Sequence, residues 1–266
     1  MSYSEILYEQ EGHVLTITLN RPEVMNALSR ITYREFEEAL NRANDDESVR
    51  AIVITGAGRA FCSGDDVRQV MLAPEEVENR RLKRLRQAKA QPTPSAARLL
   101  TLDVPTIAAV NGAAMGWGMD LALMCDIRIA SEKARFAMLY VLRGLVCDIG
   151  GMYCLPRIVG TARAYELLYT GEVIDAAEAD RIGLVSRVVP PERLLEEAQT
   201  LARRIAENPP LAVRRIKEGV RRGLGYDVLA LGEYVTGSLS ILFETEDHKE
   251  GANAFLEKRK PVFRGR

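Results

Sequence analysis

The sequence predicts an α/β fold that ends in a helical region, and three observations lead to this prediction. Short apolar runs, typical of strands buried on both faces, recur at residues 51–55 and 105–110. Stretches with apolar residues at helical spacing follow these runs. From residue 161 onward, the patterns are helical only. Strands that alternate with helices, followed by helices alone, indicate an α/β core with a helical tail.

The expected strands begin at the start of the chain. Apolar alternation at residues 5–10 and 13–19, on either side of Glu11 and Gly12, predicts a β-hairpin. Ser29 is expected to cap a helix that runs to about Asn44. The apolar run at 51–55 predicts a buried strand, and the long polar stretch that runs through Arg98 is expected to be helical but mobile.

The second half of the chain moves from strands to helices. A buried strand is predicted at residues 105–110, and an apolar helix from about Trp117 to Met124. Two short strands are expected at 127–130 and 134–137. The helices expected after these strands cover residues 161–169, 176–182, 191–206, 210–222 and 226–256.

The composition excludes several classes of function. The chain has 266 residues, with 36 Lys plus Arg and 37 Asp plus Glu, so its formal net charge is −1. This balance gives no electrostatic basis for binding a nucleic acid or an anionic membrane. A hydrophobic fraction of 47% and a charged fraction of 27% are typical of a globular protein and exclude a disordered chain.

The cysteines and histidines narrow the chemistry further. The four cysteines (Cys62, Cys125, Cys147 and Cys154) form no CxxC pair, so free thiols in a reducing compartment are expected, and the protein is predicted to be cytoplasmic. The two histidines, His13 and His248, lie near no nucleophile motif. A Ser-His-Asp system and a metal site built from His and Cys are therefore not predicted.

Two loops rich in glycine share one pattern: a buried strand, small residues with glycines, and then the start of a helix. They occupy residues 51–66 and 105–120. If the loops lie side by side, two backbone N–H groups can point at one oxygen and form an oxyanion hole. The alternative is a pair of tight turns without a ligand. Neither loop has the GxxxxGK[ST] or GxGxxG pattern of a nucleotide site.

Segments along the whole chain resemble the crotonase (enoyl-CoA hydratase/isomerase) superfamily. They are Leu19-Asn-Arg-Pro22, Asn26-Ala-Leu28, Ala60-Phe-Cys-Ser-Gly-Asp-Asp66, Ala108-Ala-Val-Asn-Gly112, Cys125-Asp126, Ile129-Ala-Ser131, Gly144-Leu145, Leu155-Pro-Arg-Ile-Val-Gly160, Gly183-Leu-Val185 and Phe255-Leu-Glu-Lys-Arg-Lys-Pro261. These segments follow the order of the family over essentially the full length. The resemblance therefore carries much more weight than any single motif.

The resemblance implies a spiral ββα core at residues 1–200 and a C-terminal helical oligomerisation region at 201–266, usually in trimers or hexamers. It also implies an enzyme that acts on acyl-CoA thioesters through an enolate. Coenzyme A then enters as part of the substrate, and no permanently bound cofactor or metal is expected. The oxyanion donors carried over from the family are the backbone N–H groups of Asp65 and Trp117. Trp117 departs from the family, which usually has glycine at this position.

The acid–base residues are also carried over from the family. The familiar pair of hydratase carboxylates matches Asp120 and Tyr140, so the second carboxylate is replaced by a phenol. Asp148 lies where the dienoyl-CoA isomerase branch and some hydrolase branches carry a functional aspartate. We therefore expect Asp120 and Asp148 to divide the acid and base roles, with Tyr140 orienting substrate or water.

Each of these residues also has a structural interpretation. Asp120 suits the first turn of any helix because of the helix dipole, and Asp148 suits a helix N-cap. Trp117 is the only tryptophan of the chain and suits a packed core. These interpretations stay open at the level of the sequence.

The family resemblance also suggests where coenzyme A would be held. Arg21, Ala60, Cys62, Asp66 and Arg68 match positions that grip the pantetheine, adenine and phosphates, and Met25 stands where many relatives have a basic residue. The basic cluster of Lys258, Arg259 and Lys260, together with Phe263, is expected to reach the coenzyme A of a neighbouring subunit. The alternative is that this terminal run of charges is only exposed to solvent. Cys62 is interpreted as a small packing residue and not as a nucleophile.

The leading hypothesis is an enzyme that hydrates enoyl-CoA thioesters or shifts their double bond. A CoA-thioester or ring-opening hydrolase of the same fold is the alternative among enzymes, because water activation by Asp148 would suffice for it. A non-catalytic acyl-CoA-binding protein is the alternative outside enzymes, and the departures at Trp117 and Tyr140 are the reason to consider it.

Overall fold

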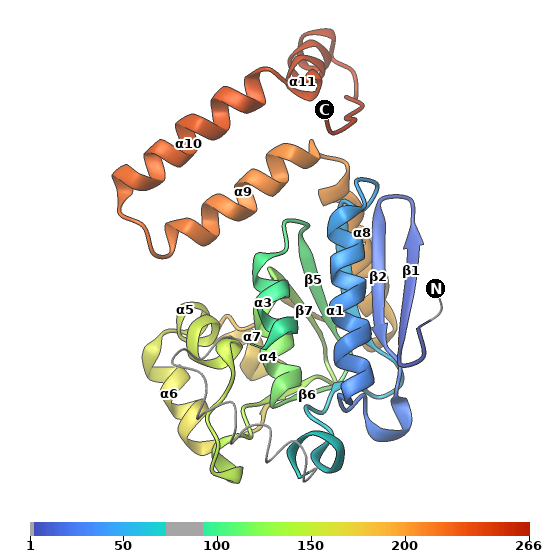
Figure 1. The fold of residues 1–266 in the computed structure, drawn as a ribbon, viewed down its shortest axis with the longest axis vertical. Helices are drawn as coiled ribbons and strands as arrows, with labels where there is room; N and C mark the ends of the chain where they lie inside the picture. Colours follow the sequence, from blue (N-terminus) through green and yellow to red (C-terminus); the bar gives the residue numbers. More distant parts are fainter. Residues whose placement is uncertain (1–2, 73–92) are drawn as a thin grey trace, which may run out of the picture.

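The computed structural model of the protein describes residues 3–72 and 93–266 (Figure 1). In this part of the chain, six strands form a sheet in the order β1-β2-β3-β5-β7-β10. The first two strands are antiparallel and the other neighbours are parallel. The strands are β1 (Ile6–Glu11), β2 (Val14–Leu19), β3 (Ala51–Gly56), β5 (Thr106–Val110), β7 (Ile127–Ser131) and β10 (Arg187–Val189). The predicted hairpin and both predicted buried strands are confirmed, although the hairpin turns one residue later than expected, at Gly12 and His13.

A second, smaller sheet has the order β4-β6-β8-β9 within the described residues. Its strands are β4 (Ala60–Cys62), β6 (Ala113–Met115), β8 (Arg135–Ala137) and β9 (Ile174–Asp175). The prediction of loops at β4 and β6 is wrong, and so is the prediction of helices alone beyond residue 161, where β9 and β10 lie. A strand of two or three residues is too short for a pattern of alternation to be recognised.

The six-stranded sheet is covered by helices on both faces. On β3, Ile52 and Ile54 pack on the side of α1 (Arg30–Asp45), α3 (Pro94–Thr101) and α4 (Trp117–Met124). The alternate residues of this strand, Ala51 and Val53, pack against α8 (Leu194–Ala206) on the other side. Every residue of β3 and β5 is buried, which confirms the prediction of strands buried on both faces.

Helix α1 begins where the sequence predicts. The Ser29 hydroxyl accepts hydrogen bonds from the backbone N–H groups of Ile31 at 3.0 Å and Thr32 at 3.1 Å. This cap satisfies donors that would otherwise have no partner at the start of the helix. The buried face of α1 carries Phe36 and Leu40. Its first turn brings Tyr33 toward the glycine loops, as described below.

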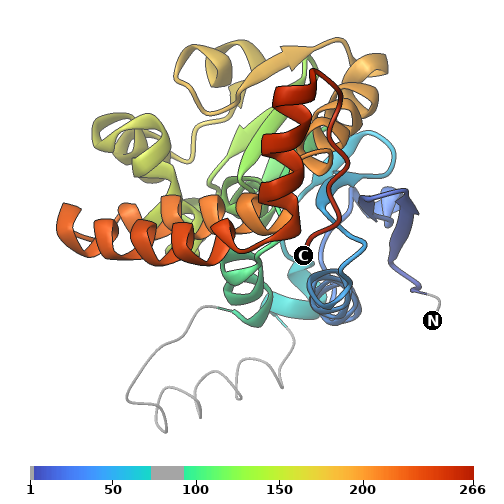
Figure 2. The same ribbon diagram turned by 90° about the horizontal axis from the view of Figure 1, so that it is seen from above.

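The C-terminal helices extend away from this core (Figures 1 and 2). They are α9 (Pro210–Gly223), α10 (Val228–Phe243) and α11 (Glu246–Glu257). The buried Lys217 ammonium ties α9 to the core, with Nζ 2.8 Å from an Asp126 carboxylate oxygen and 2.8 Å from the Val104 carbonyl oxygen. The single helix predicted over 226–256 is wrong, because the Thr245 hydroxyl accepts from the N–H of His248 and starts a new helix.

The other helices of the described residues lie in the connections between these elements. They are α5 (Leu155–Val159), α6 (Thr161–Thr170) and α7 (Ala176–Arg181), with the short turns η1 (Pro22–Val24), η2 (Val67–Met71), η3 (Val141–Arg143), η4 (Gly150–Cys154) and η5 (Pro191–Arg193). The predicted helices at 161–169, 176–182, 191–206 and 210–222 are confirmed. Of the helical stretch expected before Arg98, residues 73–92 lie outside the described residues. The expected boundary at residue 200 falls inside α8, so we propose that the C-terminal region starts after α8.

Candidate active site

The two glycine loops lie side by side. β4 and β6 pair in parallel, which brings the segments that follow them to one edge of the small sheet. A Cβ atom on Gly118 would lie 2.1 Å from the Cys62 carbonyl oxygen, and one on Gly64 would lie 2.8 Å from the Met115 carbonyl oxygen. Only glycine allows the two backbones to approach this closely. The structure therefore brings together the loops that carry Asp65 and Trp117.

Trp117 is the first residue of α4, and the residue before it makes this start possible. Gly116 is the N-cap and adopts φ +52° and ψ −121°, a conformation that other residues avoid. The backbone N–H groups of a first helical turn have no acceptor within the helix. The described non-glycine residues with positive φ are Met25, Asn26 and Lys258, so Trp117 has an ordinary backbone conformation. A tryptophan can therefore occupy this position without strain.

Asn26 holds the first glycine loop from beneath. Its side-chain amide donates to the carbonyl oxygens of Ala57 at 2.9 Å and Ala60 at 2.8 Å, and its Oδ1 accepts from the N–H of Arg21 at 2.9 Å. The side chain is buried, with 1% of its surface exposed. The segment Asn26-Ala-Leu28 was noticed as a family motif, but no sequence pattern indicated that this amide binds the loop at residues 57–60.

Asp120 lies one turn into α4 and is fully buried. Its Oδ2 accepts a hydrogen bond of 2.6 Å from the Tyr140 hydroxyl. Its Oδ1 accepts a hydrogen bond of 2.6 Å from the N–H of Gly151 in the first turn of η4. A Cβ on Gly150 would lie 2.6 Å from Oδ1, so this position also requires glycine. Asp120 therefore contacts Tyr140 directly and lies behind it.

The Asp148 carboxylate accepts hydrogen bonds from a different set of donors. Its Oδ2 lies 3.3 Å from the indole Nε1 of Trp117 and 3.4 Å from the Thr93 hydroxyl, and both donate to it. Its Oδ1 accepts from the N–H of Ile149 at 2.7 Å. The amide of Gly151 in the following turn binds Asp120 instead of Asp148. The Asp148 backbone carbonyl accepts from the N–H of Met152 at 3.1 Å, as the carbonyl of an N-cap residue does, but its side chain does not accept from the N–H of Gly151 as a capping side chain would.

Tyr33 joins the site from α1. Its hydroxyl donates a hydrogen bond of 2.5 Å to Oδ1 of Asp65. Its ring meets the indole of Trp117 edge-on, with the ring centroids 5.1 Å apart and the planes at 81°. The sequence pattern predicts Tyr33 as a residue of this helix but not as a site residue, and it does not indicate Thr93. Helical spacing shows which face of α1 is buried, but not which distant loop that face meets.

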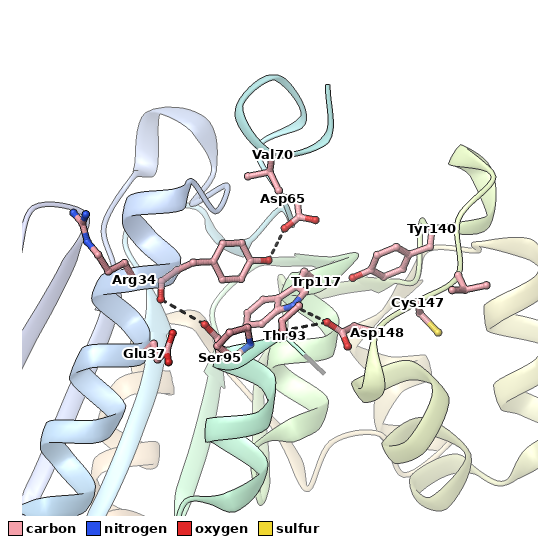
Figure 3. A pocket seen from close by; sticks show the side chains of 13 residues that line it. Arg34, Glu37, Asp65, Val70, Thr93, Ser95, Trp117, Tyr140, Cys147 and Asp148 are labelled. Carbon is pink, nitrogen blue, oxygen red and sulfur yellow. Dashed lines mark hydrogen bonds between the residues drawn. The ribbon is translucent and has the colours of Figure 1, made fainter. Parts of the chain in front are cut away.

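These side chains surround one cavity of about 570 Å³ (Figure 3). Asp65, Trp117, Tyr140 and Asp148 all line it, as do Tyr33 and Thr93. Four of the five residues expected to be catalytic therefore share one cavity, and the fifth, Asp120, supports Tyr140 from behind. The remaining lining residues are Arg34, Glu37, Val70, Pro94, Ser95, Val146 and Cys147.

Burial changes the acid–base properties of these groups. It raises the pKa of Asp120 to about 7, against the opposing effect of the hydrogen bonds from Tyr140 and Gly151. Burial, together with the adjacent Asp120 carboxylate, raises the pKa of the Tyr140 phenol far above its usual value. The pKa of Tyr33 is raised for the same reasons, with Asp65 as the neighbouring carboxylate. Both phenols therefore keep their protons at neutral pH.

The cysteines near the site are not activated. Burial raises the pKa of Cys62 to about 12, and burial and the nearby Asp120 raise that of Cys147 to about 11. A nucleophilic cysteine needs a lowered pKa. This agrees with the interpretation of Cys62 as a packing residue.

The residues expected to grip coenzyme A near the site fall into two groups. Arg21, Asp66 and Arg68 lie together, since the Arg21 guanidinium is 3.5 Å from the Asp66 carboxylate and Asp66 accepts from the N–H of Arg68. Ala60 and Cys62 are buried in β4, with exposed fractions of 1% and 0%. Their side chains are therefore closed to a ligand, and only their backbone atoms remain as candidates for a contact.

The chain's own tail lies far from this cavity. Phe263 lines a separate cavity with Arg50 and His13, and its carbonyl oxygen accepts from the Arg50 guanidinium at 3.1 Å. Helix α11, whose C-cap is Lys258, lies at the opposite end of the molecule from β6 (Figure 1). Within one chain, the structure does not bring Lys258 and Phe263 to the site.

Comparisons with known proteins identify the family of the chain. The family model described as enoyl-CoA hydratase/isomerase matches residues 9–266. The chain belongs to this family. It is 40% identical to the crotonyl-CoA hydratase of Syntrophomonas wolfei over 99% of both chains. It is 38% identical to the short-chain-enoyl-CoA hydratase of Clostridium acetobutylicum over 98% of this chain and 97% of that one.

The solved structures of the enoyl-CoA hydratase/isomerase family include close matches in fold. An enoyl-CoA hydratase structure from Geobacillus kaustophilus superimposes with a TM-score of 0.89 at 42% identity, covering 99% of both chains. One from Bacillus anthracis gives a TM-score of 0.91 at 35% identity, covering 99% of this chain and 100% of that one. The family and the crotonase fold predicted from the sequence are confirmed, as is the expectation of a hydratase/isomerase-type enzyme.

Two further findings concern residues 3–72 and 93–266. No group of three or more His, Cys, Asp or Glu side chains is arranged to hold a metal ion there. Within the same residues, no helix has the length and apolar character needed to cross a membrane.

Proposed function

We propose that this enzyme adds water across the double bond of a 2-enoyl-CoA thioester and catalyses the reverse dehydration. The observation that carries the proposal is the composition of one cavity: the N-terminus of α4, the Tyr140 hydroxyl backed by Asp120, and the Asp148 carboxylate. The names of the relatives, crotonyl-CoA hydratase and short-chain-enoyl-CoA hydratase, support the choice of hydration.

The thioester oxygen is proposed to lie between the two glycine loops. The donors are the backbone N–H groups of Asp65 and Trp117, and they stabilise the negative charge that develops when the thioester becomes an enolate. Such preorganised donors act where charge appears in the transition state, which is why they accelerate the reaction. The close approach of Gly64 and Gly118 to the opposite loop supports this arrangement.

Proton transfer is proposed to use both sides of the cavity. Asp148 takes a proton from water as the water oxygen bonds to C3 and the electrons of the double bond move onto the thioester oxygen. Tyr140 then gives its proton to C2, and Asp120 in its protonated form replaces the proton of Tyr140. Asp148 ends with the proton of the water, Asp120 ends ionised, and exchange with solvent resets both. The 2.6 Å between the Tyr140 hydroxyl oxygen and Oδ2 of Asp120 lets a proton pass between them, once Tyr140 turns its own proton toward C2 and protonated Asp120 becomes the donor.

Coenzyme A is proposed to bind as part of the substrate, on the side of Arg21, Asp66 and Arg68. Backbone atoms of Ala60 and Cys62 would form the edge beside it. Lys258 and Phe263 belong to this proposal only as contributions from a neighbouring subunit. No permanently bound cofactor takes part in the steps described above.

The test is a panel of acyl-CoA thioesters incubated in deuterated water and analysed by mass spectrometry. The panel contains linear enoyl, dienoyl, cyclic enoyl and aromatic acyl groups. Hydration adds the mass of water with one deuterium at C2 while the acyl group stays on coenzyme A. A double-bond shift without added water would replace hydration by isomerisation, and release of free thiol would indicate a hydrolase. Binding without any turnover or deuterium uptake would indicate a non-catalytic acyl-CoA-binding protein.

A homotrimer or homohexamer built through the C-terminal helices also forms part of the proposal. Apolar side chains on and between α9 and α10 are exposed in the single chain: Ile216 at 66%, Val220 at 64%, Val228 at 80% and Leu229 at 78%. Burial of these side chains against a second copy would stabilise the assembly. Light scattering should give three or six times the chain mass of 29.6 kDa. The mass of a single chain would contradict this part.

We propose a cytoplasmic location because the cysteines form no disulfide bonds. Cys62, Cys125, Cys147 and Cys154 are all free, which suits a reducing compartment.

A further inference from the structure

The side chain of Trp117 lies between the two halves of the site. Its indole Nε1 donates to Oδ2 of Asp148 at 3.3 Å, while its ring meets Tyr33 edge-on. The Tyr33 hydroxyl in turn binds Asp65. A continuous row of side chains, Asp65–Tyr33–Trp117–Asp148, therefore runs along one wall of the cavity (Figure 3).

The indole is held firmly in this row. Only 3% of the surface of Trp117 is exposed. Trp117 belongs to the main hydrophobic core, and its backbone starts α4. A buried aromatic side chain with neighbours on its faces and edges keeps one rotamer. Its N–H therefore points in a fixed direction, which is the requirement for a group that orients another.

The segment that leads to Asp148 is held less firmly. Leu142 and Val146 on this segment are exposed by 65% and 76%, and Leu145 by 45%. Packing therefore contributes little to the position of Leu142, Leu145 and Val146, although Cys147, directly before Asp148, packs against the core. The donors from Trp117 and Thr93 come from the other wall of the cavity and attach the carboxylate to it.

We propose that Trp117 is a positioning residue: its indole N–H fixes the orientation of the Asp148 carboxylate toward the substrate. The role of Asp148 in taking a proton from water rests on the proposed function, whereas the indole–carboxylate hydrogen bond does not. One residue then serves the site twice, with its backbone N–H directed at the thioester oxygen and its side-chain N–H at the base. A glycine at position 117 can supply only the first of these donors.

The first test does not depend on activity. Trp117 is the only tryptophan in the chain, so a ¹⁵N-labelled sample gives a single indole N–H resonance. In Asp148→Ala, the loss of the acceptor should move this resonance upfield, toward the position of an indole without a hydrogen bond. Asp148→Asn keeps an oxygen acceptor and should leave it closer to the wild-type position. Asp46→Asn, beyond the far end of α1, is the matched control and should not move it.

An indole resonance that is the same in Asp148→Ala and in the wild type would overturn the proposal. A shift of equal size in Asp46→Asn would also overturn it, because the resonance would then report a general change of the fold.

The second test separates positioning from enolate stabilisation. Trp117→Phe keeps the backbone N–H and an aromatic edge for Tyr33 but lacks the indole N–H. A small misplacement of a catalytic group lowers the rate by up to about 100-fold. We therefore expect kcat for hydration to fall about 10-fold to 100-fold with KM nearly unchanged, while deuterium uptake at C2 of the hydrated product continues. Thr93→Val removes the other side-chain donor to the same oxygen and should produce a smaller effect of the same kind.

The outcomes remain distinguishable from failure of the proposed function. If the wild-type enzyme neither hydrates nor exchanges any thioester, the proposed function fails, and the indole resonance alone decides the positioning role. If the wild type is active and Trp117→Phe retains full kcat, the positioning role fails and hydration stands.

Discussion

The Tyr140 hydroxyl donates a 2.6 Å hydrogen bond to Asp120, and only Tyr140 of this pair lines the cavity. A substrate in the cavity therefore meets a phenol, with the carboxylate directly behind it. This arrangement gives a role to the residue that departs from the two-carboxylate pattern of hydratases.

The rate of hydration should depend on the protonation of Asp120. Burial raises the pKa of this carboxyl to about 7, so it carries a proton below pH 7 and loses it above. Because the relay needs that proton, kcat for hydration should fall as the pH rises through about 7. Since Asp120 and Tyr140 are titratable groups joined by a hydrogen bond, the limb belongs to the pair and not to one residue. In Asp120→Asn this limb should be absent from the profile of kcat against pH, and its persistence would contradict the relay.

Single replacements of the three acid–base residues should lower the rate of hydration by different amounts. Tyr140→Phe removes the group that touches the substrate, whereas Asp120→Asn leaves Tyr140 in place, so Tyr140→Phe should be the more damaging of the two. A positioned general acid or base contributes about 10²–10⁴-fold, which sets the size of the loss. Asp148→Asn should abolish hydration of the enoyl thioester, but it should retain deuterium uptake at C2 when the 3-hydroxyacyl-CoA product is supplied as the substrate, because that exchange needs only removal and return of the C2 proton. Steady-state kinetics and mass spectrometry measure these losses, and near-wild-type hydration by Asp148→Asn would show that Asp148 is not the base.

The backbone donor at residue 117 can be removed without interrupting α4. Proline is well tolerated at the first position of a helix, which Trp117 occupies. Trp117→Gly and Trp117→Pro both lose the indole, but only the proline variant lacks the backbone N–H. The loss of one oxyanion donor costs about 10²–10³-fold, so the proline variant should be slower than the glycine variant by this factor. Equal kcat values in the two variants would exclude this N–H as a donor.

The close contact between the glycine loops should make the protein less stable when a side chain is added at Gly118. In Gly118→Ala the new methyl group would lie 2.1 Å from the Cys62 carbonyl oxygen, so the loops must move apart. Overpacking of this kind costs about 1–3 kcal/mol, which corresponds to a fall of about 2–12 °C in the melting temperature for a chain of this size. Gly225→Ala, in the turn between α9 and α10, has no atom within 4 Å of its new methyl group and is the control. Calorimetry on both variants measures the difference.

The buried Asp120 should also make the stability of the protein depend on pH. Its pKa is about 7 in the folded protein, above the ordinary value near 3.9 in an unfolded chain. The folded state therefore holds the proton more tightly, and the free energy of unfolding should fall between about pH 4 and pH 7, by up to about 1.4 kcal/mol per pH unit. Asp120→Asn has no proton to lose, so its stability should lack this loss. Urea unfolding at several pH values makes the comparison, and parallel curves for both proteins would refute it.

The sequence predicts those parts of the fold that repeat a local pattern. The hairpin, the buried strands β3 and β5, and the start of α1 at Ser29 all follow from spacing or capping within a few residues. The short strands β4, β6 and β9 exist because distant segments pair with them, so their own residues carry no sign of them. The break at Thr245 was missed because the apolar spacing continues on both sides of it.

The site shows the same limit. The resemblance to a family identified Asp65, Trp117, Tyr140 and Asp148, and the structure brings these side chains to one cavity. The partner that each side chain binds could not be derived in this way. Tyr33 lies 84 positions before Trp117, and nothing along the chain indicates that the two rings meet. The order in which Tyr140 and Asp120 face the cavity likewise depends on the packing of α4 beneath η4.

The way α8 covers the sheet has a consequence for synthesis of the protein on the ribosome. The face formed by Val53, Ile107 and Ile129 packs against α8, whose residues Leu194, Ala198 and Ala202 come late in the chain. The strands of this face are therefore made well before the helix that covers them. A nascent chain that pauses before residue 194 presents an uncovered apolar sheet, which chaperones must shield from other nascent chains.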